Sequence, residues 1–331
     1  MISELTLAVP TFNRRDAIVK NTRHALQGIE GMPIEYLVID NASNDGTYES
    51  LINEFGENDQ ATFLRNSENI GYFGNFLEIL KSCRTRYILI SSDEDCFLTE
   101  NIQYLLSFLK EKNPLMVSSQ VVLSGKKGLY RGRNNISKIT DREVRSSSNY
   151  ISGIVFDCLF LRDYFYFLER NAKNQMAFIY PQVILASILF LKGDLYWIDV
   201  QLTKKRCQLE SDIIDADGGK YSSLESRVRQ VRGYDKLLID ISQEFGCSDK
   251  VDSLKKQNMD TALSLFWHAL NLESNKNLIN SFDESAQNFY LKKLFETLGF
   301  YSLLLKIDYL DGEKHIIRAA VDAHRQLCSP R

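Results

Sequence analysis

The N-terminal part of the chain alternates between short apolar runs and longer stretches in which apolar residues recur every three or four positions. The apolar runs predict strands and the periodic stretches predict helices. The predicted strands are 5–9, 34–39, 61–64 and 87–91, and the predicted helices are 14–28, 47–55 and 73–83. Strands that alternate with helices of this length indicate βαβ units, so we expect an α/β fold with a mostly parallel sheet and helices on both faces.

The middle of the chain continues with apolar segments of several lengths. A helical pattern over 101–112 precedes an apolar run over 115–123, which predicts a further strand. The segment 124–148 is rich in Gly, Lys, Arg, Ser and Asn, which predicts a loop or an irregular hairpin. A strand is expected over 150–156, and Gly153 inside it indicates a bulge or a close approach to the backbone.

The most apolar stretch runs from Met176 to Leu191 and contains Pro181. It is shorter than the roughly 20 residues that cross a bilayer, and an internal proline disfavours a continuous span. We therefore expect a buried helix. From about Ser222 the pattern is helical nearly to the end of the chain, after an interruption at Gly218-Gly219. The length predicts about two domains, which we expect over 1–218 and 219–331.

Composition and charge narrow the class of protein. The 40 Lys and Arg residues stand against 43 Asp and Glu, a formal charge of −3, so we expect no nucleic-acid partner. The six cysteines are scattered singly and the four histidines form no HExxH pattern, which argues against zinc ribbons, dithiol chemistry and histidine-based metal sites. The start of the chain carries no signal-peptide pattern. We expect a reduced, cytoplasmic protein that holds any anionic ligand locally.

Polar motifs follow each of the first four predicted strands. In an open parallel sheet the ligand crevice lies beyond the carboxyl ends of the strands, so these motifs are expected at one edge. They are Pro10-Thr-Phe-Asn-Arg14, Asp40 with its following turn, Asn69-Ile-Gly-Tyr-Phe-Gly-Asn75 and Asp93-Glu-Asp95. The first lacks the glycines of GxGxxG and GxxxxGK[ST], which excludes the two commonest nucleotide cradles there. Asp40 is suited to accept a hydrogen bond from a nucleobase or a ribose, and equally to cap a turn.

Asp93, Glu94 and Asp95 form an acidic turn directly after an apolar strand. Three consecutive carboxylates repel one another unless a cation or strong hydrogen-bond donors share the site. Mg²⁺ and Mn²⁺ prefer oxygen ligands from one or two carboxylates together with substrate phosphates. The acidic turn is therefore a candidate metal site, and a solvated helix cap is the alternative.

Taken in order, the four motifs resemble those of family 2 glycosyltransferases of the GT-A fold, over roughly residues 3–125 and more weakly to about 200. The resemblance implies a Rossmann-like GT-A domain that binds a nucleotide-sugar, followed by a helical C-terminal region. It implies that Asp40 contacts the base. The residues that it places on the floor of the nucleotide pocket are Pro10, Thr11, Asn13 and Arg14, and those along the ribose and diphosphate are Asn69, Gly71 and Asn75.

The acidic turn then resembles the DxD element, which holds Mn²⁺ or Mg²⁺ on the donor diphosphate in this family. Two registers fit, one with Asp93 and Asp95 as the pair and one with Glu94 at the main metal-ligand position. We expect Glu94 and Asp95 nearest the metal and Asp93 on ribose or sugar hydroxyls. Gly153 resembles the glycine beside the donor sugar and the acceptor.

The catalytic base is where the sequence departs from the family. An acidic residue is expected some 25 to 30 positions after Gly153, but the chain reads Phe178-Ile-Tyr-Pro-Gln-Val183 there. Tyr180 and Gln182 are poor bases near neutral pH, because tyrosine has a reference pKa of about 10 and glutamine does not titrate. Asp157 and Asp199 are the substitute candidates for the base, and we expect Asp157 to be catalytic together with Asp93, Glu94 and Asp95.

The resemblance implies an inverting, metal-dependent hexosyltransferase that uses a nucleotide-sugar, such as a UDP-sugar, in bacterial O-antigen, lipopolysaccharide or capsule synthesis. The implied acceptor is a saccharide or a lipid-linked saccharide, at the inner face of the cell membrane. The region 219–331 is open to three roles: acceptor binding, formation of a homodimer or peripheral docking on a membrane surface.

Two other functions stay open. A non-catalytic nucleotide-sugar-binding or scaffold protein of the same fold is motivated by the missing base. A nucleotidyltransferase also uses an α/β sheet and Mg²⁺, but it needs a glycine-rich, basic loop after the first strand. Thr11-Phe12-Asn13 does not supply such a loop.

Overall fold

A computed structural model of the chain describes residues 3–123, 129–205, 224–247, 249–255 and 257–258. The chain divides into two compact units, Met1–Asp217 and Gly218–Arg331. The predicted helices beyond residue 258 lie outside the described residues. The two units are considered one at a time.

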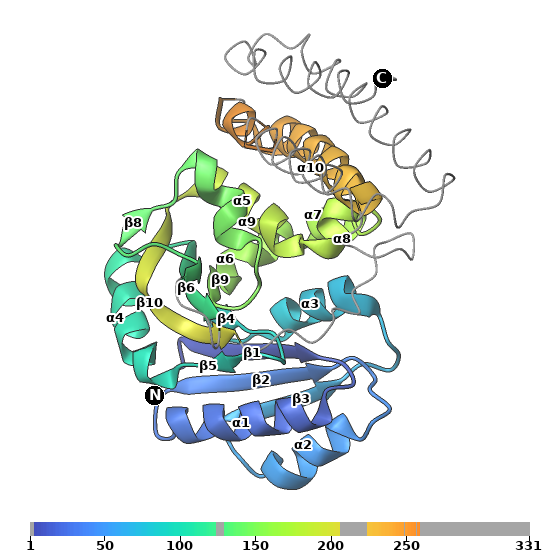
Figure 1. Cartoon of the computed structure of the whole chain (residues 1–331), viewed down its shortest axis with the longest axis vertical. Helices are drawn as coiled ribbons and strands as arrows, with labels where there is room; N and C mark the ends of the chain where they lie inside the picture. Colours follow the sequence, from blue (N-terminus) through green and yellow to red (C-terminus); the bar gives the residue numbers. More distant parts are fainter. Residues whose placement is uncertain (1–2, 124–128, 206–223, 248, 256, 259–331) are drawn as a thin grey trace, which may run out of the picture. The chain divides into compact units, whose positions relative to one another are not determined.

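The N-terminal unit is built on one mixed sheet, shown in Figure 1, with the strand order β3-β2-β1-β4-β9-β6-β10-β5. In addition, β7 pairs with β6 and β8 pairs with β10. The strands are β1 (Leu5–Thr11), β2 (Ile34–Asp40), β3 (Ala61–Arg65), β4 (Tyr87–Ile90), β5 (Cys96–Phe97), β6 (Met116–Leu123), β7 (Leu129–Arg131), β8 (Ser137–Lys138), β9 (Ile154–Asp157) and β10 (Leu195–Lys205).

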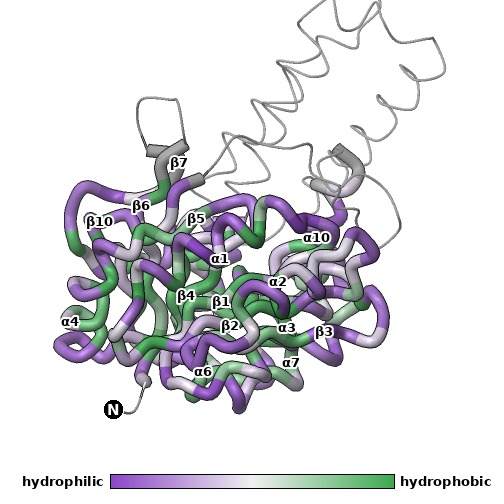
Figure 2. The backbone as a smooth tube through the Cα atoms, turned by 90° about the horizontal axis from the view of Figure 1, so that it is seen from below, coloured by the Kyte–Doolittle hydropathy of each residue, from purple (hydrophilic) through white to green (hydrophobic). Residues whose placement is uncertain are grey.

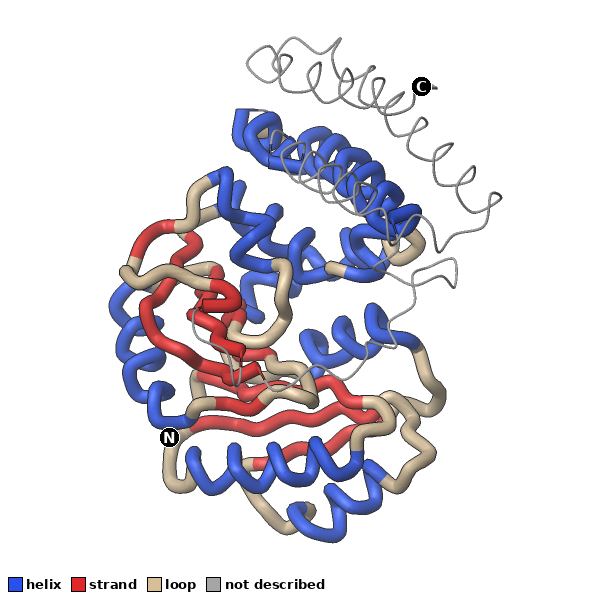
Figure 3. The backbone as a smooth tube through the Cα atoms, in the orientation of Figure 1, coloured by secondary structure: helices blue, strands red, loops and turns tan. Residues whose placement is uncertain are grey.

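Helices cover the sheet on both faces, as Figure 3 shows for the strands in red and the helices in blue. The helices are α1 (Arg15–Ile29), α2 (Thr47–Phe55), α3 (Gly71–Ser82), α4 (Ile102–Lys112), α5 (Val144–Ser148), α6 (Cys158–Leu161), α7 (Phe165–Arg170), α8 (Gln175–Ile179) and α9 (Pro181–Lys192). Short 3₁₀ turns occupy Thr99–Asn101, Asp141–Glu143 and Arg162–Tyr164. The predicted α/β fold class is confirmed.

The core explains why these segments form strands. The side chains of Leu5, Leu7 and Val9 in β1 are buried together with Ile18 of α1 and Leu51 of α2. Burying one such side chain contributes about 1.5–3 kcal/mol, so a continuous apolar run is stable only where both faces are covered. Residues of α1, α2 and α4 form this cluster, whereas α3 packs on β1 and β2 from the other face. Figure 2 shows the apolar character of β1 and β4.

The register of the sheet places the predicted motifs at one edge. Strand β1 pairs in parallel with β2, from Leu5 opposite Ile34 to Thr11 opposite Asp40. It also pairs in parallel with β4, and β2 pairs in parallel with β3. The carboxyl ends of β1, β2, β3 and β4 therefore lie at the same edge, which is called the carboxyl edge from here on.

Strand β9 differs from the prediction. It begins at Ile154 rather than at residue 150, and it runs antiparallel between β4 and β6. Ile90 faces Ile154 and Tyr87 faces Asp157. The residues just before β9 consequently lie at the carboxyl edge, and the end of β9 lies at the opposite edge.

Two other segments differ from the prediction. One contains more regular structure than expected, and the other forms two helices where one was expected. The segment 124–148 contains β7, β8 and α5 within its described residues. The buried stretch around Pro181 forms two helices instead of one, because proline has no N–H for a helical hydrogen bond and takes the first position of α9. Tyr180 precedes Pro181 and ends α8, and its N–H donates a hydrogen bond to the Met176 carbonyl oxygen at 2.8 Å.

In the C-terminal unit the structure describes α10 (Leu224–Phe245) and a further helical segment up to residue 258. Val231, Tyr234, Leu238 and Ile241 are buried at helical spacing along α10. Asn258 donates to the Val231 carbonyl oxygen at 3.0 Å. Across the part of the chain that the structure describes, no helix combines the length and the hydropathy that a membrane span requires.

Candidate functional site

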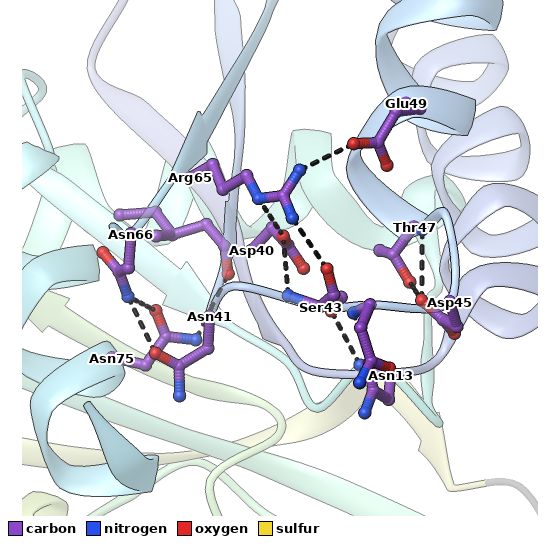
Figure 4. Close-up of polar contacts among 12 residues, drawn as sticks. Asn13, Asp40, Asn41, Ser43, Asp45, Thr47, Glu49, Arg65, Asn66 and Asn75 are labelled. Atoms are coloured by element: carbon purple, nitrogen blue, oxygen red, sulfur yellow. Dashed lines mark hydrogen bonds and ion pairs between the residues drawn. The ribbon is translucent and has the colours of Figure 1, made fainter. Parts of the chain in front are cut away.

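The loops after β1 and β2 are joined by side chains at the carboxyl edge. The backbone N–H of Asn13 donates to Ser43 Oγ at 2.7 Å, and Asn13 Oδ1 accepts from the Asn44 N–H at 2.9 Å. Figure 4 shows Asn13 lying against Ser43. Asn13 and Ala42 adopt positive φ angles of 52° and 59°. Such backbone is uncommon outside glycine and is held here by the contacts between the two loops.

Asp40 ends β2 and is fully buried. Its Oδ2 accepts from the Ser43 N–H at 3.1 Å and lies 3.5 Å from Nε of Arg65, the last residue of β3. Its Oδ1 has no hydrogen-bond partner. A buried carboxylate oxygen without a partner is costly. The predicted base-contacting residue therefore presents an unsatisfied acceptor at the carboxyl edge, as Figure 4 shows.

Asparagines connect the loops after β2 and β3. Asn41 Nδ2 donates to Asn69 Oδ1 at 2.7 Å, and Asn66 Nδ2 donates to Asn41 Oδ1 at 2.9 Å and to Asn75 Oδ1 at 3.1 Å. Figure 4 shows Asn41, Asn66 and Asn75 gathered in this way. Asn75 is 3% exposed, so it holds the loops rather than facing solvent. Gly71 has a φ of +73° and open space around a Cβ position, which leaves its backbone accessible.

The carboxylates of the acidic turn have different partners. Thr11 Oγ1 donates to Asp93 Oδ2 at 2.8 Å, and the Arg14 guanidinium lies 3.5 Å from Glu94 Oε1. Asp95 Oδ2 accepts from Ser152 Oγ at 2.6 Å and from the Tyr150 hydroxyl. The exit of β1 and the loop before β9 therefore both contact the acidic turn.

Burial raises the pKa of Asp93 to about 6, and the hydrogen bond from Thr11 and the charge of Arg14 oppose that rise. A carboxylate with this pKa exchanges a proton near neutral pH.

The backbone of the acidic turn is held by a side chain of α1. Asn21 of α1 donates from Nδ2 to the carbonyl oxygens of Asp93 at 2.8 Å and Asp95 at 2.6 Å.

The donor set determines what kind of metal site could form here. Among the described residues no group of three or more His, Cys, Asp and Glu side chains converges on a metal position. Asp95 is 3% exposed, whereas the Glu94 side chain is 26% exposed. Mg²⁺ and similar ions are commonly held by one or two carboxylates together with substrate phosphates. The acidic turn fits an ion that binds with a diphosphate, with Glu94 as its accessible carboxylate.

Gly153 lies in the turn just before β9, not inside the strand as predicted. Its φ is +81°, its N–H donates to the Ile90 carbonyl oxygen at 3.0 Å, and its carbonyl oxygen accepts from the Ser119 N–H at 3.0 Å. The loop before β9 is thus fixed to β4 and β6 next to Ser91 and the acidic turn.

Asp157, a candidate catalytic residue, lies away from the acidic turn. Asp157 faces Tyr87 at the start of β4, so it lies at the edge opposite to the acidic turn. Its Oδ2 accepts from Arg86 Nη2 at 2.9 Å, and its Oδ1 accepts from the Phe160 N–H at 3.0 Å as the N-cap of α6. These contacts give Asp157 a structural role.

The other candidates for the base have their own surroundings. Tyr180 lies close to Tyr72 in the first turn of α3, and burial together with the Tyr180 phenol raises the pKa of Tyr72. Gln182 is 2% exposed and its Oε1 has no hydrogen-bond partner. Asp199 is exposed on β10 and accepts from the Tyr104 hydroxyl of α4 at 3.3 Å. Tyr180 therefore lies beside α3, Gln182 is buried in the first turn of α9, and Asp199 contacts α4.

Some residues of the site are missed by the sequence reasoning. They are Asn21, Asn41, Ser43, Arg65, Asn66, Tyr150 and Ser152. Arg65 follows an apolar strand at the same position as Asp40 does, and Tyr150 and Ser152 flank Gly153. Apart from Asn21, which lies within α1, their position near strand ends was the available signal, and their partners depend on the order of strands in the sheet.

This sheet, with its loops joined at the carboxyl edge and an acidic turn after β4, defines an α/β protein of the GT-A-like fold. Residues 6–169 match the family described as glycosyl transferase family 2, so this segment belongs to that family. No curated protein matches the chain.

Solved structures resemble the chain in fold. Residues 1–349 of TarS from S. aureus superpose with a TM-score of 0.68 and 12% identity, covering 99% of this chain and 93% of TarS 1–349. The same protein in complex with UDP-GlcNAc gives a TM-score of 0.65, 13% identity and coverages of 97% and 89%. The mannosyltransferase PcManGT from Pyrobaculum calidifontis, in complex with GDP-Man and Mn²⁺, gives 0.50, 12% identity and coverages of 99% and 89%.

Proposed function

We propose that this chain is a metal-dependent glycosyltransferase that moves a sugar from a nucleotide-sugar, a UDP-sugar in the first instance, to an acceptor hydroxyl. The observation that carries the proposal is the carboxyl edge, where the unpartnered Oδ1 of buried Asp40 lies at the end of β2 and the acidic turn follows β4, and these two strands flank β1. Family membership and the nucleotide-sugar complexes of TarS and PcManGT support it.

The donor pocket is proposed to lie between the loops after β1, β2 and β3. Asp40 accepts from the base, while the backbone at Pro10, Thr11 and Asn13 forms the floor of the pocket. Arg14 is partly exposed and cationic, so it is placed to meet the diphosphate. Asn69 and Gly71 lie along the ribose and diphosphate, and Asn75 acts by holding the loops.

The acidic turn is proposed to hold Mn²⁺ or Mg²⁺ through Glu94 and Asp95, with Asp93 directed at ribose or sugar hydroxyls. The bound ion supplies stabilisation of the charge that develops on the departing nucleoside diphosphate. Asp95 is oriented for this by the hydroxyls of Tyr150 and Ser152. Arg14 pairs with Glu94 and places positive charge beside the same diphosphate.

As the acceptor oxygen bonds to the anomeric carbon, the nucleoside diphosphate leaves with the electrons of the broken bond and the hydroxyl proton is proposed to pass to water. Inversion requires attack opposite the leaving group. Tyr180 lies beside α3, and Tyr180 and Gln182, which stand in the sequence where the resemblance implies the base, are proposed to orient the acceptor hydroxyl. The acceptor is proposed to be a saccharide or lipid-linked saccharide of bacterial surface-polysaccharide synthesis. The acceptor is proposed to bind at the inner face of the membrane. Residues 219–331 are proposed to take part in acceptor binding, dimer formation or membrane docking.

The proposal is tested by calorimetric titration of the purified protein with UDP, CDP, GDP and dTDP, with and without Mn²⁺. We expect one nucleotide to bind in a Mn²⁺-dependent manner. Glu94→Gln with Asp95→Asn should abolish that dependence and the transfer activity. The double variant Glu30→Gln with Asp59→Asn makes the same charge change at exposed residues outside the carboxyl edge and should leave both unchanged.

The outcomes are separable. No binding of any nucleotide by the folded protein rejects the donor site, and retained metal-dependent turnover in the Glu94 and Asp95 double variant rejects the metal assignment.

A non-catalytic nucleotide-sugar-binding protein is the second candidate, favoured by Tyr180 and Gln182 at the position of the family's acidic residue. It predicts donor binding with neither transfer nor donor hydrolysis for any acceptor. Donor hydrolysis measured in the absence of acceptor distinguishes the two functions.

A further inference from the structure

Arg65 is the last residue of β3, and it reaches across the loop that follows β2. Its Nη2 donates to the Ser43 carbonyl oxygen at 2.8 Å, its Nη1 pairs with Glu49 Oε1 of α2 at 2.6 Å, and its Nε lies 3.5 Å from Asp40 Oδ2. Figure 4 shows the guanidinium between Asp40, Ser43 and Glu49. One side chain thus fixes a carboxylate, a loop and a helix together.

The ion pair between Arg65 and Asp40 matters because Asp40 is buried. Asp40 is 0% exposed, and a buried carboxylate is strongly disfavoured unless a cation and hydrogen-bond donors accompany it. Within the described part of the chain, Arg65 is the cation that pairs with Asp40. Arg65 itself is 35% exposed in its side chain, so the pair connects the buried carboxylate to the surface.

The contacts also determine which oxygen is left for a ligand. Oδ2 is taken by the Ser43 N–H and by Arg65, and Oδ1 has no partner. With Oδ2 held, the plane of the carboxylate is fixed and Oδ1 has one direction. An ionised carboxylate only accepts hydrogen bonds, so Oδ1 is matched to a ring N–H and repels a ring nitrogen lone pair.

We propose that Arg65 sets the base preference of the donor pocket by holding Asp40 in this orientation. The inference rests on the proposed function. The preferred ligands are nucleoside diphosphates whose base carries a ring N–H beside a carbonyl, as uracil does, over those with a bare ring nitrogen there, as in cytosine. Arg65 is a positioning residue, because it acts through Asp40.

UDP and CDP are the probes, since their bases differ at this edge and hardly differ in size. Calorimetric affinities for both are measured at a fixed Mn²⁺ concentration in the wild-type chain, Arg65→Met and Arg65→Lys. The matched control is Arg23→Met, which removes a partly exposed guanidinium that pairs with Glu54 between α1 and α2, away from Asp40. Melting temperatures are recorded for each variant to establish that it is folded.

We expect the wild-type chain and Arg23→Met to prefer UDP over CDP by about tenfold or more, the effect of one hydrogen bond to a charged group. In Arg65→Met the Asp40 carboxylate can rotate, and its Oδ1 can then accept hydrogen bonds from donors in the loop after β2. The affinity for UDP should fall by about tenfold and the preference should collapse towards equality. Arg65→Lys restores the positive charge without the fork of donors and should recover part of the preference.

The inference is overturned if folded Arg65→Met keeps the wild-type preference, or if the wild-type chain prefers CDP. It is also overturned if Arg65→Met loses affinity for both nucleotides equally, because that result indicates a general role in holding the loop. Failure of the wild-type chain to bind any nucleotide rejects the proposed function itself, which separates the two failures.

Discussion

The Ser152 hydroxyl donates a hydrogen bond of 2.6 Å to Asp95 Oδ2, across a sequence separation of 57 residues. Ser152 Oγ also accepts from the Ser92 N–H at 2.9 Å, so the same hydroxyl contacts the residue before the acidic turn and the last residue of the turn. Tyr150 adds a second hydroxyl to Asp95 Oδ2. The acidic turn is therefore completed by the loop before β9 and not by β4 alone.

The first prediction concerns these hydroxyls. Tyr150→Phe and Ser152→Ala each remove a donor from a carboxylate that is 3% exposed, and each should lower the free energy of unfolding by about 1–2 kcal/mol. Because Asp95 would lose its orientation, Mn²⁺-dependent nucleotide affinity should fall several-fold in the double variant. Urea denaturation and calorimetry measure the two effects. Ser146→Ala removes an exposed hydroxyl and is the control.

Wild-type affinity in the Tyr150 and Ser152 double variant would show that the orientation of Asp95 has no bearing on donor binding. The proposed metal site would then rest on Glu94 and not on Asp95.

Much of the N-terminal unit is predictable because its central strands are buried on both faces. Such strands must be almost wholly apolar, as Leu5 to Val9 in β1 and Tyr87 to Ile90 in β4 are, and their ends are marked by the first polar residues. Asp40 and Asp93 were therefore placed correctly at the ends of β2 and β4. They lie at the same edge of the sheet because β2 and β4 both pair in parallel with β1, one on each side of it.

The direction of a strand is not encoded in an apolar run, so the sequence does not show at which edge of the sheet Asp157 lies. Ile154 to Phe156 are buried whichever way β9 runs. Antiparallel pairing with β4 brings Gly153 to the carboxyl edge and sends Asp157 to the other. The pairing of Asp40 with Arg65 was missed for a similar reason, since it depends on β2 and β3 being neighbours in the sheet.

A second prediction separates Asp157 from catalysis. Asp157→Asn weakens the ion pair with Arg86 and keeps an oxygen that can cap α6. The Asp157 side chain is 5% exposed, and Arg86 is 40% exposed and solvated, so we expect a loss of stability of about 1–2 kcal/mol. The value of kcat/KM should stay within about twofold. Arg86→Met should have a similar effect on stability, and a large fall in kcat for Asp157→Asn alone would contradict the structural role.

A third prediction follows from Asp45, which precedes α2. Partial burial raises its pKa, but donors from Thr47 and the Arg15 N–H outweigh burial, so the pKa lies below its usual value. A lowered pKa in the folded state stabilises the fold above the unfolded-state pKa of about 4, and that contribution is lost as pH falls through the folded-state value.

Asp45→Asn should therefore reduce the free energy of unfolding by about 1 kcal/mol at pH 7. The difference from the wild-type chain should stay constant down to about pH 5 and shrink below about pH 4. Denaturation with urea across this pH range measures it, with the exposed Asp59→Asn as control. A difference that grows as the pH falls would mean that the ionised form of Asp45 is not the stabilising one.

The last prediction tests whether α1 positions the acidic turn. Asn21 is 4% exposed and donates to the backbone carbonyl oxygens of Asp93 and Asp95. Asn21→Leu preserves the approximate volume but removes both donors, which should cost about 2–3 kcal/mol of stability. Asn21→Asp turns an acceptor and a buried charge towards the same carbonyl oxygens and should cost more.

Thr22→Val is the control for Asn21 because it lies on the same helix, is fully buried and loses a hydrogen bond with the Tyr36 hydroxyl at 3.1 Å, away from the turn. Both helix variants should be less stable than the wild-type chain. At a temperature where both are folded, Asn21→Leu should lower Mn²⁺-dependent nucleotide affinity by about tenfold, whereas Thr22→Val should leave it unchanged. Equal nucleotide affinities in the two variants would mean that Asn21 contributes to stability and not to donor binding. The geometry of the acidic turn would then depend on β4 and the loop before β9.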